Sequence, residues 1–147
     1  MVELLVAGAE KQLFASAHDC SDGGLAVALG ECCMMNREEQ VGARIDLGAW
    51  STLPIAALLF GETQNRVIIS TTVPDAVLAA ARTHGVPARV IGSVAAQSPT
   101  LAIRAASWSI EAPVARLAAA WHDAIPVIMS RSVAAARAVI TETLSQR

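Results

Sequence analysis

The sequence predicts one domain in which helices and strands alternate, an architecture of the α/β or α+β class. Its 147 residues suit a single domain, and 54% hydrophobic against 16% charged residues supply a sizeable core and argue against a disordered chain. Segments with apolar residues at helical spacing alternate with short runs rich in β-branched residues, which favour strands. We therefore expect helices packed on a sheet.

The N-terminal part is expected to contain two helices joined by a short strand. Apolar residues predict a first helix that ends near Phe14, and residues 15–18 then form the strand. The second helix extends from about Asp22 to about Asn36, with Ser21 or Asp22 as its N-cap. Its apolar residues recur at i, i+3, i+4 and i+7, as on one helix face: Leu25, Ala28, Leu29 and Cys32.

Later elements are bounded by residues that start or stop helices and strands. Ser51 and Pro54 offer a cap and an early proline for a short helix, and His84-Gly85 follows the end of another. β-Branched residues mark a buried strand at 66–72. The predicted segments are a strand at 43–47, helices at 54–60, 74–81 and 113–122, and strands at 66–72, 86–93, 101–104 and 108–110.

The approach to the second helix, residues 17–25, brings together two carboxylates, a histidine and two glycines. Gly23 and Gly24 would let a ligand approach the backbone, and the unpaired N–H groups of a helix start favour an anion such as phosphate. Asp19 and Asp22 beside that anion suggest a bridging Mg²⁺, which prefers hard oxygen ligands. The same residues are also common in caps and turns, so a purely structural role stays open.

A second motif, residues 59–70, reads Leu-Phe-Gly-Glu-Thr-Gln-Asn-Arg before a hydrophobic run, and its loop would bring Glu62 and Gln64 next to a strand. With residues 17–29, this motif resembles the C-terminal domain shared by the aminoimidazole ribonucleotide synthetase superfamily. The resemblance is most specific to the last domain of phosphoribosylformylglycinamidine synthases. It covers about residues 3–129 and also includes Val90-Ile91-Gly92, Leu117, Trp121 and Ile125-Pro126.

The resemblance implies a mixed β-sheet with packed helices over residues 1–129 and a role in an ATP-dependent carbon–nitrogen ligase of purine biosynthesis. Such a synthase converts formylglycinamide ribonucleotide and glutamine-derived ammonia to the amidine. It implies ATP and Mg²⁺ as cofactors, and the remaining synthase domains and a glutaminase subunit or domain as partners. It further implies a Mg²⁺ ligand at Asp19 and substrate or nucleotide contacts at Asp22, Gly23, Gly24, Glu62, Thr63, Gln64 and Arg66.

Alternatives to a ligase domain are a noncatalytic domain that packs the same enzyme together, or a domain of another superfamily member. Selenophosphate synthetase, thiamine-monophosphate kinase and a hydrogenase maturation protein share the superfamily. The ligase hypothesis and the noncatalytic hypothesis differ over the roles of four residues. In the first, the side chains of Asp19, Asp22, Glu62 and Arg66 converge on a ligand, and in the second they make only caps and salt bridges. We expect the chain to be a fragment of a longer protein and, alone, to lack synthase and ATPase activity.

Charge and hydropathy exclude several other function classes. The net charge is −2, from 13 acidic and 11 basic residues, without a basic run, so a nucleic-acid surface is not indicated. Neither an apolar stretch of about 20 residues nor a secretory signal pattern is present, so we expect no membrane association and a cytosolic protein. Residues 130–147 depart from the family pattern and predict an amphipathic helical tail, either packed or available to a partner.

The cysteines and histidines carry weaker signals. Three cysteines without paired spacing indicate neither a disulfide framework nor a zinc site, so we expect reduced, metal-free thiols, with Cys32 in the core. A structural hydrogen bond is favoured over a catalytic role for His18. His84 and His122 lie near helix ends, where partial positive charge suits the helix dipole.

Overall fold

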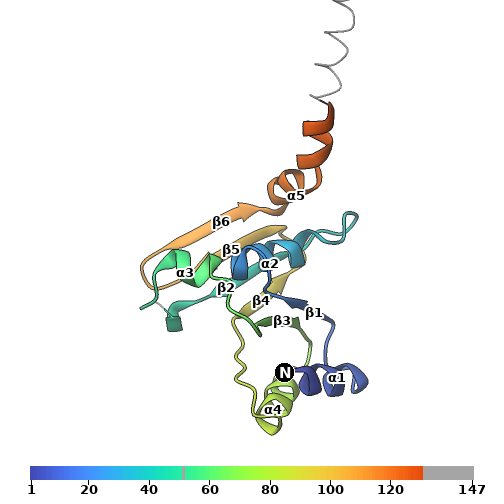
Figure 1. Ribbon diagram of the computed structural model, residues 1–147, viewed down its shortest axis with the longest axis vertical. Coiled ribbons are helices and arrows are strands. Elements are labelled where there is room, and N and C mark those ends of the chain that lie inside the picture. Colours follow the sequence, from blue (N-terminus) through green and yellow to red (C-terminus); the bar gives the residue numbers. More distant parts are fainter. Residues whose placement is uncertain (51, 131–147) are drawn as a thin grey trace, which may run out of the picture.

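The structure is a computed structural model, and it describes residues 1–50 and 52–130. Helices and strands alternate along this part of the chain, which confirms the predicted fold class (Figure 1). In chain order the elements are α1 (Val2–Glu10), β1 (Ser16–Asp19), α2 (Gly24–Met34), β2 (Gly42–Asp46), the 3-10 turn η1 (Gly48–Trp50), α3 (Ile55–Phe60), β3 (Val67–Ser70), α4 (Pro74–Thr83), β4 (Gly92–Ala95), β5 (Thr100–Arg104), β6 (Ser109–Pro113) and α5 (Val114–His122).

The larger of the two sheets found in the described residues is a mixed sheet with strand order β4-β2-β5-β6. Strands β2 and β5 are parallel, whereas the β2/β4 and β5/β6 pairs are antiparallel. The helices α2, α3 and α5 cover one face of this sheet (Figure 1). Alternate residues of β2 and β5 point into that layer, and Leu47 and Val114 are fully buried there.

The opposite face of the mixed sheet is polar. Arg44 and Asp46 alternate with buried Ala43 and Ile45 along β2, and the Asp46 carboxylate accepts a hydrogen bond from Arg104 on the neighbouring strand at 3.0 Å. Because both side chains are exposed, this pair contributes little to stability. The sheet therefore has one face packed against helices and one polar face. No helix in residues 1–50 and 52–130 combines the length and the apolar character needed to span a membrane.

The smaller sheet pairs β1 with β3 in antiparallel register, with Asp19 opposite Val67. The pairing continues past the strand ends, because the Cys20 N–H donates to the Arg66 carbonyl at 2.9 Å. The C-terminal end of β1 thus lies beside the N-terminal start of β3. As a result, the loop that follows β1 and the loop that precedes β3 share one edge of the molecule.

Several predicted boundaries are wrong for identifiable reasons. Helix α1 ends at Glu10, because Gln12 adopts a left-handed conformation (φ of 53°) and the chain turns so that the Phe14 ring packs over Gly8. Residues 86–91 are not a strand, and the strand predicted there is β4, farther along the chain. Pro87 in this run cannot donate a ladder hydrogen bond.

The strand predicted at 66–72 is shorter, and it is half-buried rather than buried, because it pairs with β1 in the small sheet. The helix predicted at 74–81 extends to Thr83, and its expected end is confirmed, with His84 as C-cap and Gly85 at a φ of 63°. Ser51 and the tail predicted for residues 130–147, apart from Ser130, lie outside the described residues.

The start of α2 packs directly against the backbone of the second motif. Gly24 has a φ of 68°, and a Cβ there would lie 2.8 Å from the Phe60 carbonyl carbon and 2.9 Å from the Gly61 oxygen. The close approach that the sequence predicted for a ligand is therefore made, at Gly24, by the chain's own backbone. Glycine is required for both the positive φ and the contact.

Replacing Gly24 with alanine should destabilise the fold more than the same change at a glycine that has only the positive φ. Gly85 is the matched control, because its φ is 63° and, among the described residues beyond its chain neighbours, no atom lies within 4 Å of the place that a Cβ would take. We expect Gly85→Ala to lower the free energy of unfolding by about 1 kcal/mol and Gly24→Ala by about 3 kcal/mol, since overpacking adds to backbone strain. Urea denaturation measures both, and equal losses would contradict the close contact.

Candidate functional site

An open pocket of about 530 Å³ lies where the loop after β1 meets the loop before β3. Six of the eight site residues predicted from the sequence line this pocket, whereas Gly23 and Gly24 lie beside it at the start of α2. The lining residues are Met1, Asp19, Cys20, Ser21, Asp22, Glu62, Thr63, Gln64, Asn65, Arg66 and Val67. The β1/β3 pairing therefore brings the two motifs to one surface.

Asp19 is the last residue of β1, and its side chain is 69% exposed. The Ser21 hydroxyl donates a hydrogen bond to Asp19 Oδ2. This bond, followed by a backbone hydrogen bond and the nearby His18 ring, lowers the pKa of the Asp19 carboxyl below its ordinary value. Asp19 is thus a carboxylate at neutral pH, in the state that a hard cation requires. Asp22 is also exposed and lines the same pocket.

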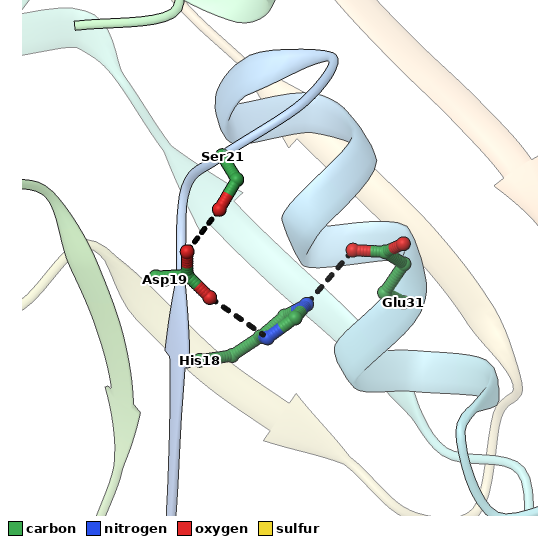
Figure 2. A network of polar contacts seen from close by, with 4 residues as sticks. All are labelled: His18, Asp19, Ser21 and Glu31. Carbon is green, nitrogen blue, oxygen red and sulfur yellow. Dashed lines mark hydrogen bonds and ion pairs between the residues drawn. The ribbon is translucent and has the colours of Figure 1, made fainter. Parts of the chain in front are cut away.

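A short network of polar contacts leads from Asp19 into the protein (Figure 2). His18 Nε2 lies 2.8 Å from Glu31 Oε2 on α2, and His18 Nδ1 lies 3.9 Å from Asp19 Oδ1. The structural hydrogen bond favoured for His18 is therefore present, but its partner is Glu31. Glu31 was missed as a site residue because it lies 13 residues away on the following helix, where nothing local identifies it as a partner.

The N-terminal end of α2 is capped from a distant part of the chain. The predicted cap by Ser21 or Asp22 is wrong: the N-cap is Gly23, with a φ of 78°, and it makes no side-chain cap. The Gly23 N–H instead donates to Glu62 Oε1 at 2.9 Å, across 39 residues. The Glu62 carboxylate thus accepts a hydrogen bond from one of the N–H groups that the sequence predicted would bind an external anion.

Arg66 stabilises the second loop from within. Its guanidinium donates hydrogen bonds to the Gly61 carbonyl and, at 3.4 Å, to the Thr63 carbonyl. Asn65 in the same loop has a φ of 61°, a conformation that asparagine tolerates better than most residues. Thr63 and Gln64 are exposed, and no hydrogen bond of the described residues engages their side chains. These two side chains are free to meet a ligand.

The pocket offers carboxylate oxygens, but too few to make a metal site by themselves. Among residues 1–50 and 52–130, no group of three or more His, Cys, Asp or Glu side chains is arranged to hold a metal ion. Asp19 and Asp22 nevertheless offer carboxylate oxygens in an open pocket, and Mg²⁺ is commonly held by one or two carboxylates together with water and substrate phosphates. The residues present therefore fit Mg²⁺ only as one side of a shared site.

The fold and this pocket define a domain class that sequence comparison also identifies. Residues 1–103 match the family model described as AIR synthase related protein, C-terminal domain, and the chain belongs to this family. It is 41% identical over 133 residues to the phosphoribosylformylglycinamidine synthase subunit PurL of Anaeromyxobacter sp. (strain Fw109-5), covering 86% of this chain and 17% of that protein. It is 40% identical over 128 residues to PurL of Chlorobium luteolum, covering 84% of this chain and 17% of that protein.

Solved structures share the fold at lower sequence identity. T. maritima PurL complexed with ATP superposes with a TM-score of 0.68 at 22% identity, covering 80% of this chain and 21% of that chain. T. maritima PurL complexed with FGAR gives the same TM-score and identity, with 20% of that chain covered. The chain therefore spans about a fifth of the length of the relatives and structures that it matches.

The three cysteines are free thiols, two of them buried. The prediction that Cys32 lies in the core is wrong: its neighbour Cys33 is buried there, and Cys32 is half-buried. Burial is the main cause that raises the pKa of each thiol, and for Cys32 it does so to about 11. At neutral pH these thiols are protonated, which makes them poor nucleophiles and poor metal ligands.

Native thiol alkylation should therefore be slow, and it should accelerate as the pH approaches 11. For Cys32, a pKa of about 11 in place of 9.0 leaves roughly a hundredfold less thiolate at pH 8. We expect three reactive thiols in denaturant without reductant. Rapid alkylation of the folded chain at pH 8, fewer than three thiols after denaturation, or stoichiometric zinc would contradict this assignment.

Proposed function

We propose that this chain is the C-terminal domain of a phosphoribosylformylglycinamidine synthase. In this proposal the whole enzyme uses ATP and glutamine-derived ammonia to convert formylglycinamide ribonucleotide to the amidine in purine biosynthesis. One observation carries the proposal: two motifs some 40 residues apart in the sequence line a single open pocket with Asp19, Asp22, Thr63 and Gln64. The identity of about 40% to relatives named PurL supports the same function.

We propose that the pocket forms one wall of a shared nucleotide site. Asp19 and Asp22 supply carboxylates for Mg²⁺, and Mg²⁺ would neutralise phosphate charge when bound. Thr63 and Gln64 can donate and accept hydrogen bonds, which suits the phosphate or amide groups of a nucleotide substrate. Glu62 and Arg66 hold the loop that presents them. Because the described residues provide few metal ligands, the rest of the site would come from other domains.

The proposal extends to the partners and the location of the whole protein. The remaining synthase domains would complete the pocket and carry most of the ATP-binding residues. A glutaminase subunit or domain would supply ammonia, and the complex would work in the cytoplasm. The names of the relatives support these partners and this location, and the chain covers about 17% of the length of those relatives.

A noncatalytic role in the same enzyme is the second candidate, and a specific observation favours it. Glu62 caps α2 and Arg66 binds backbone carbonyls of its own loop, so two charged residues of the motifs make internal contacts. The pocket wall nevertheless keeps Asp19 and Asp22 exposed, and a domain that served only for packing would need neither carboxylate. The two candidates make opposite predictions for Asp19.

Substituting Asp19 by asparagine in the full-length protein separates these candidates. A metal ligand should lose Mg²⁺ or nucleotide affinity by more than about tenfold, roughly 1.4 kcal/mol, with little change in the free energy of unfolding. Isothermal titration and urea denaturation measure the two quantities. Asp46→Asn is the matched control, because Asp46 is also an exposed carboxylate with a lowered pKa, caused mainly by the Gly48 N–H and by Arg104.

The control variant should bind as the wild type does, since Asp46 is not part of the pocket. If Asp19→Asn keeps full affinity but loses about 1 kcal/mol of stability, Asp19 is a structural hydrogen-bonding group and the nucleotide-site proposal fails.

A further inference from the structure

One face of α5 packs against the core of the domain. Val114 and Ala118 on this face are buried, and Leu117 packs against the same core cluster. A Cβ at Gly30 of α2 would lie 3.7 Å from Leu117 Cδ1, so α2 supplies the surface that α5 covers. The first half of this apolar helix face is therefore accounted for by contacts within the domain.

The same face continues toward and past the end of α5, and there it is exposed. The backbone stays helical over residues 124–130, and the Val127 N–H donates to the Asp123 carbonyl at 2.9 Å (Figure 1). Four large apolar side chains continue the i+3 and i+4 spacing of Val114 and Ala118, with exposed fractions of 54% to 69%: Trp121, Ile125, Ile128 and Met129. We call these four side chains the α5-end patch.

The α5-end patch has the composition of a protein interface and a fixed position. Contiguous exposed apolar side chains mark interaction sites, and tryptophan is prominent among the residues that dominate binding energy. The Arg37 guanidinium, on the turn after α2, donates a hydrogen bond to His122 Nδ1 at 3.0 Å. This bond ties the end of α5 to α2, so a partner would meet a helix face that is already oriented.

We propose that the α5-end patch docks into an apolar groove on another domain of the same polypeptide. The chain spans about a fifth of the length of the relatives and structures that it matches, so most of a protein of that length lies outside it. The alignment with the Anaeromyxobacter relative covers 86% of this chain, and any continuous stretch of that extent includes Trp121 and Ile125. The patch thus lies in the part of the chain that is shared with the longer proteins.

This proposal rests on the proposed function only in that the chain is one domain of a longer enzyme. It involves neither Mg²⁺ nor a nucleotide. Two other occupants make different predictions. A second copy of the chain, or its own residues 131–147, would cover the patch in the isolated 147-residue chain, whereas another domain would cover it only in the full-length protein.

The test compares thiol labelling of Ile128→Cys in the 147-residue chain and in the full-length protein, with a hydrophilic alkylating reagent and peptide mass spectrometry. Ile128 is 63% exposed, so the substitution should leave the fold intact. We expect labelling at least about tenfold slower in the full-length protein, because only local opening would expose a docked side chain. Gln97→Cys, on the exposed turn between β4 and β5, is the control and should label at the same rate in both.

Equal labelling of Ile128→Cys in the two proteins would mean that the patch stays uncovered, and the proposal would be overturned. Slow labelling already in the 147-residue chain would overturn it as well. Light scattering then identifies the occupant: a dimer indicates a second copy, and a monomer indicates residues 131–147. Because no readout depends on ligand binding, failure of the nucleotide-site proposal and failure of this one are distinguishable.

Discussion

The hydrogen bond from the Gly23 N–H to the Glu62 carboxylate is the contact on which the arrangement of the pocket depends. It joins the start of α2 to a loop 39 residues farther along the chain, and the adjacent Gly24 lets the two backbones touch. Helix starts leave N–H groups without partners, and a carboxylate is a strong acceptor for them. The second motif thus completes the helix that the first motif begins, and the pocket forms along their junction.

This junction divides the polar residues of the two motifs by task. Glu62 and Arg66 use their side chains to hold the loop and the helix start, whereas Asp19, Asp22, Thr63 and Gln64 remain available at the surface. The division explains how a pocket built from two loops can present carboxylates in a defined place. Loops position ligand-binding groups well only when a packed scaffold fixes their ends, and here the β1/β3 pairing and α2 provide it.

Local sequence signals predicted the element types well, because amphipathic spacing, β-branched runs and the His84-Gly85 stop are local properties. They also singled out the pocket residues, since the resemblance depends on the same two motifs. They failed where a distant partner decides the structure. Glu62 bonds the start of α2 in place of the expected local cap, and Glu31 pairs with His18. Neither contact can be inferred from the spacing of residues in the sequence. Helix α1 is also shorter than predicted, because the left-handed conformation of Gln12 ends it and turns the Phe14 ring back over Gly8.

The most direct measurement of the central contact is the stability of Glu62→Ala against Thr63→Ala in urea denaturation. Both residues are exposed neighbours in one loop, but Glu62 alone of the two caps Gly23 in the described structure. We expect Glu62→Ala to lower the free energy of unfolding by about 1 kcal/mol, and Thr63→Ala to change it by a few tenths at most. If the two variants are equally stable, the cap does not hold the motifs together and the account of the pocket is wrong.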